Sequence, residues 1–164
     1  MTEKQRRGVT IKTPQGDSAL SLLYKWEQLA NTGFSLDNLY VKHSPGKGLG
    51  VFARREIAAD EYIEFCHCIT CDTPRKYLAE PQISRYAYGN EDIAMILTGF
   101  GSIYNSADSP KGANAQYVVF AQNKLVVFWA QRPIEQHEEI CVYHGEGFFQ
   151  SWCKPSQPMV SMTV

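Results

Sequence analysis

The sequence predicts a mainly β protein with one helix near its N-terminus. Short apolar runs rich in β-branched and aromatic residues recur along the chain, and turns that contain glycine or proline separate them. Such runs are typical of strands in small sheets rather than of a helical bundle. The sequence shows no internal repeat and no linker that would divide it. The predicted strands cover residues 39–43, 51–53, 63–69, 116–121, 125–130 and 139–143.

The predicted helix follows a polar N-terminal arm. Apolar residues recur at helical spacing from Ala19 to Ala30, Asp17 is suited to cap the first turn, and residues 31–33 supply a stop. Because apolar stripes of this kind usually pack on the body of their own domain, we expect Trp26 to face the sheets rather than a partner protein.

Two further local elements follow from turn signals. The runs 116–121 and 125–130 are separated by three residues, which predicts a hairpin. Thr73 and Pro74 are suited to open a short helical turn, which Pro81 would end.

Composition limits the cellular setting and the partners. The 164 residues include 16 basic and 17 acidic side chains, and the formal net charge of −1 gives no basis for direct binding to nucleic acid. No apolar run approaches the roughly 20 residues of a membrane helix, and the N-terminus lacks a signal-peptide pattern. Five cysteines, an odd number, are typical of reduced thiols. We therefore expect an intracellular protein, in the cytoplasm or nucleus, without a membrane partner.

The stretch from Gly99 to Asn114 is the most unusual part of the chain. It places glycines, small polar side chains and two asparagines between apolar runs, a composition suited to close approach of the backbone to a ligand. Two other unusual stretches, residues 46–50 and 142–145, are candidates to converge on it.

The sequence Gly46-Lys47-Gly48 resembles part of a phosphate-binding Walker loop. That loop needs a serine or threonine after the lysine to hold magnesium, and Gly48 occupies this place. A tight turn between strands is the simplest alternative. The glycines also allow main-chain groups to meet a flat, polar ligand such as an adenosyl group, because no Cβ stands in the way.

Three motifs, in order along the chain, resemble those of SET-domain protein lysine methyltransferases. The first is residues 46–53 (GKGLGVFA) and the second is residues 101–107 (GSIYNSA), followed by Pro110 and Asn114. The second is most similar to the Gly-Ser-Leu-Tyr-Asn-His-Ser variant of small stand-alone SET proteins. In the third, residues 130–145, a Glu-Glu-Ile run leads to a tyrosine. Three motifs in the same order are far more specific than any one alone.

The resemblance implies a SET-domain fold of several small sheets with a C-terminal pseudoknot. It covers roughly residues 39–152, so residues 1–38 form an appended arm and helix and residues 153–164 a tail. It also implies S-adenosylmethionine as methyl donor and the side-chain amine of a lysine as acceptor. The substrate would be a protein or peptide, histone or non-histone.

The resemblance also assigns roles to residues. Tyr143 takes the position of the catalytic tyrosine, and Tyr86, Tyr88 and Tyr104 are suited to wall a narrow channel for the lysine side chain. The expected cofactor-binding residues are Lys47, Gly48, Leu49, Gly50, Asn105, Ser106, Tyr143, Phe149 and Trp152, and Phe149 and Trp152 would close the adenine pocket as an aromatic lid. Methyl transfer to an amine needs alignment, exclusion of water and a neutral amine, but no metal.

Several residues depart from the family pattern. Ser106 and Ala107 stand where the family usually has histidine and serine, residues 109–113 lengthen the loop, and His137 replaces a turn glycine. These departures motivate a second hypothesis, a SET-like binding module with weak or no turnover. Retention of Asn105 and a tyrosine in the third motif favours the enzyme.

The cluster Cys66-x-Cys68-x2-Cys71, with His67 inside it, resembles metal-ligand spacing. Side chains alternate between the two faces of a strand, so Cys66 and Cys68 would share one face while His67 points away. We expect buried thiols and no metal at this cluster. The alternative is a zinc-stabilised interaction domain.

Overall fold

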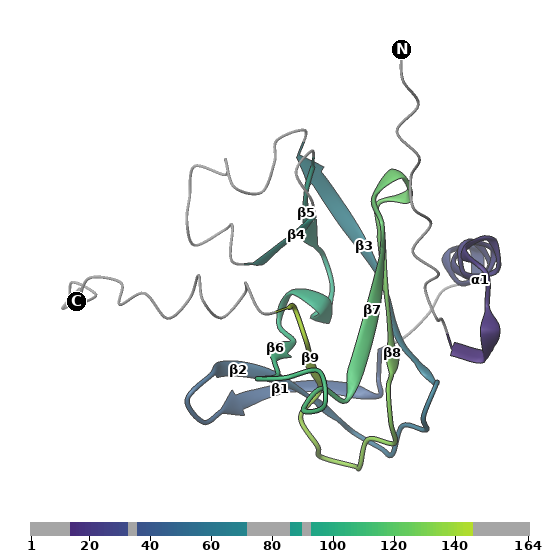
Figure 1. The fold of residues 1–164 in the computed structure, drawn as a ribbon. Coiled ribbons are helices and arrows are strands. Elements are labelled where there is room, and N and C mark those ends of the chain that lie inside the picture. Colours follow the sequence, from purple (N-terminus) through teal and green to yellow (C-terminus); the bar gives the residue numbers. More distant parts are fainter. Residues whose placement is uncertain (1–13, 33–35, 72–85, 90–92, 146–164) are drawn as a thin grey trace.

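The computed structural model of the protein describes residues 14–32, 36–71, 86–89 and 93–145, and its elements are shown in Figure 1. In this part of the chain, the α-helix α1 (Ala19–Thr32) accompanies two sheets. The predicted short helical turn at residues 73–81 lies outside the described residues. The strands are β1 (Leu39–Ser44), β2 (Gly48–Ala53), β3 (Tyr62–Cys71), β4 (Ala87–Gly89), β5 (Ala94–Leu97), β6 (Asn105–Ser106), β7 (Ala115–Phe120), β8 (Leu125–Ala130) and β9 (Cys141–Val142). Among the described residues, the short 3-10 helices are η1 (Pro14–Gly16), η3 (Phe100–Ser102) and η4 (Ala121–Asn123).

Strands β1 and β2 form an antiparallel hairpin, and the other seven strands form one curled sheet in the order β4-β5-β3-β8-β7-β9-β6. The last strand, β9, lies between two earlier ones and runs parallel to both β6 and β7. All other neighbours in the sheet are antiparallel. This arrangement confirms the mainly β fold that the sequence predicts.

The predicted strand at residues 139–143 is shorter than expected. Its first part contacts β2 instead: the Ala53 N–H donates to the Glu138 carbonyl at 3.0 Å, and the Ile140 N–H donates to the Val51 carbonyl at 2.8 Å. Only Cys141–Val142 then pairs with β6 and β7. The segment divides its hydrogen bonds between two neighbours, which an apolar pattern alone does not reveal.

Strand β8 separates two apolar cores because its side chains alternate. Leu125, Val127 and Trp129 contribute to the core beneath α1, and Val126 and Phe128 contribute to the core on the other face of the sheet. All five are buried, which explains why this strand reads as a continuous apolar run.

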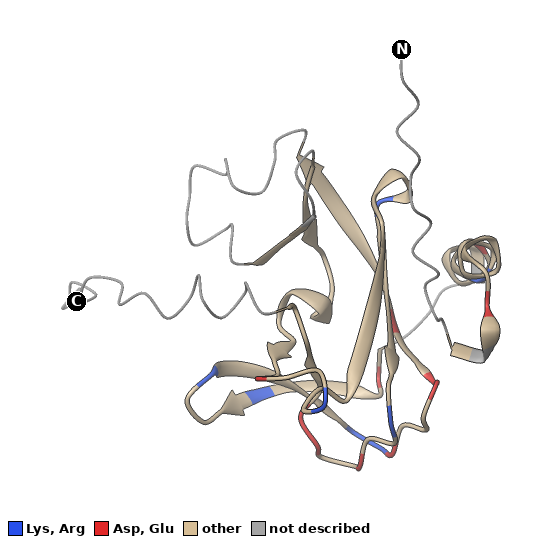
Figure 2. Cartoon of the chain, in the orientation of Figure 1, with Lys and Arg blue, Asp and Glu red and all other residues tan. Residues whose placement is uncertain are grey.

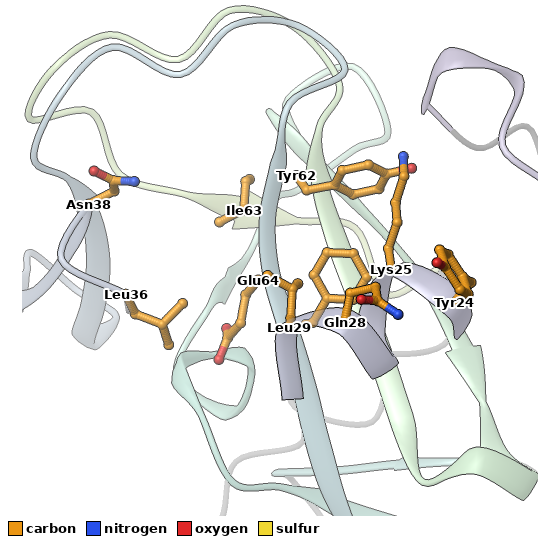
Figure 3. Close-up of a pocket in the computed structure, with 10 residues that line it drawn as sticks. Tyr24, Lys25, Gln28, Leu29, Leu36, Asn38, Tyr62, Ile63 and Glu64 are labelled. Carbon is orange, nitrogen blue, oxygen red and sulfur yellow. The ribbon is translucent and has the colours of Figure 1, made fainter. Parts of the chain in front are cut away.

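Helix α1 packs on the sheet with the apolar stripe that the sequence predicts. Leu22 is fully buried against β3 and β8, and Trp26 stacks on Phe65 with ring centroids 6.5 Å apart. A cavity of about 570 Å³ lies beside this contact. Figure 3 shows that Lys25 and Tyr62, which both line it, lie together at one end. Within the described residues, no helix has the length and apolar character needed to cross a membrane.

The start of α1 differs from the sequence-based expectation. Ser18 provides the capping side chain, since its Oγ accepts a hydrogen bond from the Ser21 N–H at 3.1 Å. Asp17 lies one residue earlier, and its carboxylate accepts hydrogen bonds from Lys25 Nζ at 2.5 Å, from Ser21 Oγ at 2.8 Å and from the Tyr62 hydroxyl. Asp17 therefore ties the helix to β3 instead of capping it.

Figure 2 shows that charged residues gather mainly on the two loops that follow β2 and β8, and that the β1–β2 hairpin carries Lys or Arg residues. Within the second loop, Arg132 pairs with Glu138 at 2.7 Å. Within the first, Arg55 pairs with Glu61 at 2.5 Å. These loops meet through mutual hydrogen bonds between the main chains of Ile57 and Ile134, both at 2.9 Å.

The Asp17 contacts predict an acid-sensitive anchor for α1. The hydrogen bonds from Lys25 and then Tyr62 lower the pKa of Asp17 from 3.8 to about 2. A lowered carboxyl pKa contributes stability that is fully present above pH 4 and is lost as the pH falls towards 2. Asp17→Asn should lower the free energy of unfolding at pH 7 by about 1.5–3 kcal/mol, the usual size for hydrogen bonds to a charged group. The difference should shrink towards pH 2 in urea titrations.

Asp108→Asn is the matched control, because Asp108 is exposed. Equal losses in the two variants, or a loss in Asp17→Asn that stays constant down to pH 2, would contradict the anchor.

Candidate functional site

The glycine-containing loop between β1 and β2 is a tight turn with an open side. The Lys47 N–H donates to the Ser44 carbonyl at 3.1 Å, and Gly46 and Gly48 have φ angles of +75° and +83°, which favour glycine. A Cβ added at either glycine would meet no protein atom within 4 Å. The main chain of this turn is therefore accessible to a ligand.

Asn105 joins this loop to the third motif. Its Nδ2 donates to the Leu49 carbonyl at 3.0 Å and to Glu139 Oε1 at 2.7 Å. The other carboxylate oxygen of Glu139 accepts from Ser44 Oγ at 2.9 Å. Gly50 is required here by space, because a Cβ at this position would lie 2.4 Å from Glu139 Oε1.

Ser106 lies in β6 opposite Val142 of β9. The following Ala107 N–H donates to the Val142 carbonyl at 2.8 Å, so the main-chain contacts of this segment do not depend on a particular side chain. The Ser106 hydroxyl donates to the Ala107 carbonyl at 3.3 Å. The structure thus brings the three sequence motifs together, as the composition of residues 99–114 led us to expect.

Asn114 fixes the approach to β9 with both ends of its buried amide. Its Nδ2 donates to Glu138 Oε1 at 2.9 Å and to the Glu139 carbonyl at 2.7 Å, while its Oδ1 accepts from the Cys141 N–H at 2.8 Å. The side chain is 2% exposed. Since both of its polar atoms have partners, Asn114 orders the third motif at little desolvation cost.

Lys47 brings positive charge to the same place. Its Nζ lies 3.8 Å from Glu139 Oε2 and 3.9 Å from Cys141 Sγ. Burial, followed by the negative charge of Glu139, raises the pKa of Cys141 to about 11, so this thiol stays protonated at neutral pH. Lys47 remains partly exposed and available to a ligand.

A group of aromatic rings lies beside these motifs, on the other side of β9. Tyr88 contacts Tyr117 at a centroid distance of 5.2 Å and His144 at 5.3 Å, and Tyr117 contacts His144 at 5.6 Å. The Tyr117 hydroxyl lies 3.3 Å from His144 Nδ1. Phe128 packs against this group, and its ring centroid lies 5.7 Å from that of Tyr117.

The three tyrosines predicted to wall a lysine channel lie in different environments. Tyr88 is buried in the aromatic group, and its hydroxyl donates to the Gly101 carbonyl at 3.1 Å. Tyr104 is buried behind Phe128, at a ring distance of 4.9 Å. Tyr86 is 55% exposed. The structure therefore brings two of the three together around Phe128 and leaves Tyr86 on the surface.

Tyr143, the predicted catalytic residue, lines a cavity of about 410 Å³. It packs in part against the small buried residues Ala107, Ala113 and Cys141. Tyr117 lines the same cavity, so the cavity connects Tyr143 to the aromatic group. The remaining lining residues are Pro110, Ala115, Gln116 and Gln131. The predicted lid residues Phe149 and Trp152 lie outside the described residues.

Glu64 is a buried carboxylate that supports residues 99–104. Its Oε1 accepts from the Phe100 N–H at 2.9 Å, and its Oε2 accepts from the Tyr104 hydroxyl at 2.9 Å. Burial raises the pKa of Glu64 even though these hydrogen bonds act in the opposite direction. Burial also raises the pKa of Tyr104. The pair therefore has a structural role beneath the aromatic group.

Of the three cysteines of β3, Cys66 and Cys68 are buried thiols, and Cys71 at the end of the strand is half-buried. Cys66 and Cys68 are 2% and 0% exposed in the same core, and His67 between them is exposed, as the alternation of a strand predicts. Burial raises the pKa of Cys68 to about 12. Among the described residues, no three or more His, Cys, Asp or Glu side chains form a group that could hold a metal ion.

A comparison with protein-family models matches residues 48–145 to the SET domain, which is more than half of the chain. The chain belongs to the SET-domain family. Members of this family are protein lysine methyltransferases. No curated protein matches the chain significantly.

Solved structures of SET-domain proteins resemble this one. A candidate histone methyltransferase from Plasmodium falciparum is 25% identical over 66% of this chain and 94% of its own, with a TM-score of 0.56. ATXR5, solved in complex with a mono-methylated histone, is 15% identical over 76% of this chain and 64% of its own, with a TM-score of 0.55. The second likeness concerns the fold alone.

Within this SET domain, three residues that contribute to the site were not predicted for it: Tyr117, Glu139 and His144. Tyr117 lies within a predicted strand, and an alternating pattern does not reveal which face lines a cavity. Glu139 and His144 belong to the third motif, so their closeness to Tyr143 in the sequence was the signal that could have identified them as site residues. The contacts of both residues depend on how β9 enters the sheet.

The close approach of Gly50 to Glu139 gives a direct test of this assembly. Gly50→Ala would place a Cβ against the carboxylate, so we expect a loss of about 1–3 kcal/mol in the free energy of unfolding, as for other overpacked sites. Thermal and urea unfolding would measure it.

Gly112→Ala is the matched control, because a Cβ there would meet its nearest atoms at 3.5 Å, an ordinary contact distance. We expect little change or a small gain in stability. Equal stability of the two variants would show that Glu139 does not pack against Gly50 as described.

Proposed function

We propose that this chain is a protein lysine N-methyltransferase that uses S-adenosylmethionine. The observation that carries the proposal is the meeting of three segments: the glycine loop, Asn105–Ser106 and Cys141–Tyr143, next to a cavity with tyrosine walls. Family membership supports lysine methyl transfer as the reaction.

The residues present fit the cofactor. An adenosyl group needs accessible main-chain donors and acceptors, and the turn at Gly46 and Gly48 offers them on its open side. We assign cofactor binding to Lys47–Gly50, Asn105 and Ser106, with Phe149 and Trp152 as a lid. When bound, the cofactor supplies a methyl group on a positively charged sulfur.

The cavity beside Tyr143 is suited to the aliphatic part of a lysine side chain. Tyr117 and Tyr143 offer aromatic surface, and Gln116 and Gln131 offer polar groups at the same cavity. Enclosure by these side chains would align the amine and exclude water, which displacement at carbon requires. We propose a protein or peptide substrate, histone or non-histone. The histone complex of a structural neighbour is in keeping with this class.

We also propose that the protein acts inside the cell, in the cytoplasm or nucleus. The four described cysteines, Cys66, Cys68, Cys71 and Cys141, are free thiols, which is typical of a reducing compartment.

The second candidate is a SET-like module that binds ligands without turnover. Ser106 and Ala107 favour the binding module. Their side chains are short, so this segment contacts β9 through its main chain and places no long side chain near the proposed cofactor site. The two candidates share the cofactor site and differ in methyl transfer, so one series of measurements separates them.

The first measurement is cofactor binding. Addition of S-adenosylmethionine at about 100 times its dissociation constant should stabilise the protein by about 2.7 kcal/mol, because the ligand binds the folded state. Replacement of Phe149 and Trp152 together by alanine should weaken binding by about 1–3 kcal/mol, measured by calorimetry. Undiminished affinity in this double variant would reject the lid.

The second measurement is methyl transfer to peptide arrays and cell extract. Tyr143→Phe removes one hydroxyl, so we expect kcat to fall at least tenfold, about 1.4 kcal/mol in the barrier, with cofactor affinity nearly unchanged. Ser106→His should instead tighten cofactor binding with a modest change in kcat.

Tyr40→Phe is the control, because the Tyr40 hydroxyl bonds to His137 on the hairpin side of the molecule, away from the cavity. Transfer by wild type that Tyr143→Phe leaves unchanged would refute the role of Tyr143. Cofactor binding with no transfer by wild type would favour the binding module.

A further inference from the structure

His144 and Tyr117 form a hydrogen-bonded pair that adjoins the cavity. Tyr117 lines the cavity, and its hydroxyl lies 3.3 Å from His144 Nδ1. His144 is half-buried, and Tyr88 holds its ring from another side at 5.3 Å. Tyr117 therefore contacts both the space where a substrate amine would lie and the imidazole behind it.

The proposed reaction creates a need for a proton acceptor at this place. A lysine side chain has an ordinary pKa near 10.4, so it arrives as an ammonium ion at neutral pH and has no lone pair for displacement. The aromatic faces of the cavity favour the cation, which opposes the loss of the proton. Imidazole is the side chain whose ordinary pKa suits it to accept and release a proton near neutrality.

The other titratable groups around the pair do not offer this capacity. Tyr88 directs its hydroxyl to the Gly101 carbonyl. Glu64 does not bond to the pair, since its carboxylate accepts hydrogen bonds from the Tyr104 hydroxyl and the Phe100 N–H. Cys66 is buried in the core near Glu64, and burial raises its pKa. Tyr143 also lines the cavity, but an imidazole is a far stronger base than a phenol. Of the described titratable groups next to Tyr117, His144 is thus the one suited to take up a proton near pH 7.

We propose that Tyr117 and His144 form a proton relay that neutralises the substrate lysine before methyl transfer. The Tyr117 hydroxyl passes its proton to His144 Nδ1 and takes a proton from the ammonium group, so a neutral amine and an imidazolium result. The amine nitrogen then forms the new N–C bond as the C–S bond breaks, and S-adenosylhomocysteine leaves with the electron pair on sulfur. The imidazolium releases its proton to water. This inference rests on the proposed function.

The first test compares pH profiles of kcat/KM for wild type, His144→Gln and Tyr117→Phe on a peptide that wild type methylates. General acid–base groups contribute about 10²–10⁴-fold, so at pH 7 each variant should lose at least 100-fold. Wild type should reach a plateau above the histidine pKa. In the variants kcat/KM should keep rising tenfold per pH unit until the lysine itself deprotonates, so the loss should shrink above pH 9.

The chain offers matched controls. His67→Gln changes an exposed histidine on β3, and Tyr40→Phe removes the hydroxyl of another tyrosine–histidine pair, which bonds to His137 at 3.1 Å. Both should keep the wild-type profile. Thermal unfolding of all four variants would show whether any loss of activity comes from loss of fold.

The second test reads the proton on His144 without turnover. Nitrogen-15 NMR of the four histidine rings, with S-adenosylhomocysteine present, would follow addition of n-butylamine at pH 8, and His144→Gln would assign the signal. The relay requires that His144 Nδ1 carries no proton and accepts from the Tyr117 hydroxyl, so we expect this tautomer at pH 8 and a shift of the Nδ1 signal in Tyr117→Phe. A His144 ring that carries its proton on Nδ1 in this complex would overturn the relay.

The outcomes separate the two proposals. Activity in wild type with an identical pH profile in His144→Gln would overturn the relay alone. Cofactor binding by wild type without methyl transfer at any pH would overturn the proposed function, and the relay with it.

Discussion

The carboxylate of Glu139 is the contact on which the candidate site depends. One oxygen accepts from Asn105 and the other from Ser44, while Lys47 lies 3.8 Å away. These partners come from the hairpin and from the second motif, so a single side chain holds all three motifs in register. Hydrogen bonds to a charged acceptor are stronger than neutral ones, and removal of the carboxylate would leave the buried Ser44 hydroxyl without this partner.

Asn114 complements Glu139 from the other side of β9. It binds the main chain of the third motif at Glu139 and Cys141, and it pairs with the Glu138 side chain. In the described part of the chain, every buried side-chain nitrogen or oxygen has a hydrogen-bond partner. The polar groups that assemble the site thus provide hydrogen-bond partners for one another. The loop from Gly99 to Asn114 can therefore bring small residues close to the turn between β1 and β2 without leaving buried polar atoms unpaired.

The sequence predicted where helices and strands lie along the chain better than it predicted which of them pair with one another. Apolar alternation and turn residues located α1, the β7–β8 hairpin and β3, because these signals are local. The division of residues 138–142 between β2 and β6 depends on pairing between distant segments, and the same is true of the contact between Tyr117 and His144. Motif order located the glycine loop, Asn105 and the third motif. It could not show that Tyr86 is exposed while Tyr88 is buried, since burial is set by tertiary packing.

The position of β9 between β6 and β7 has a consequence for synthesis of the chain on the ribosome. Residues 39–137 emerge first, and until β9 follows, the facing edges of β6 and β7 carry main-chain groups that lack their final partners. Pairing across a sequence separation of about 35 residues is slow compared with hairpin closure. A nascent chain stalled before Cys141 would lack Val142 from its core and would leave an open slot in the sheet. Such a slot is a template for intermolecular strand pairing and a recognition feature for chaperones.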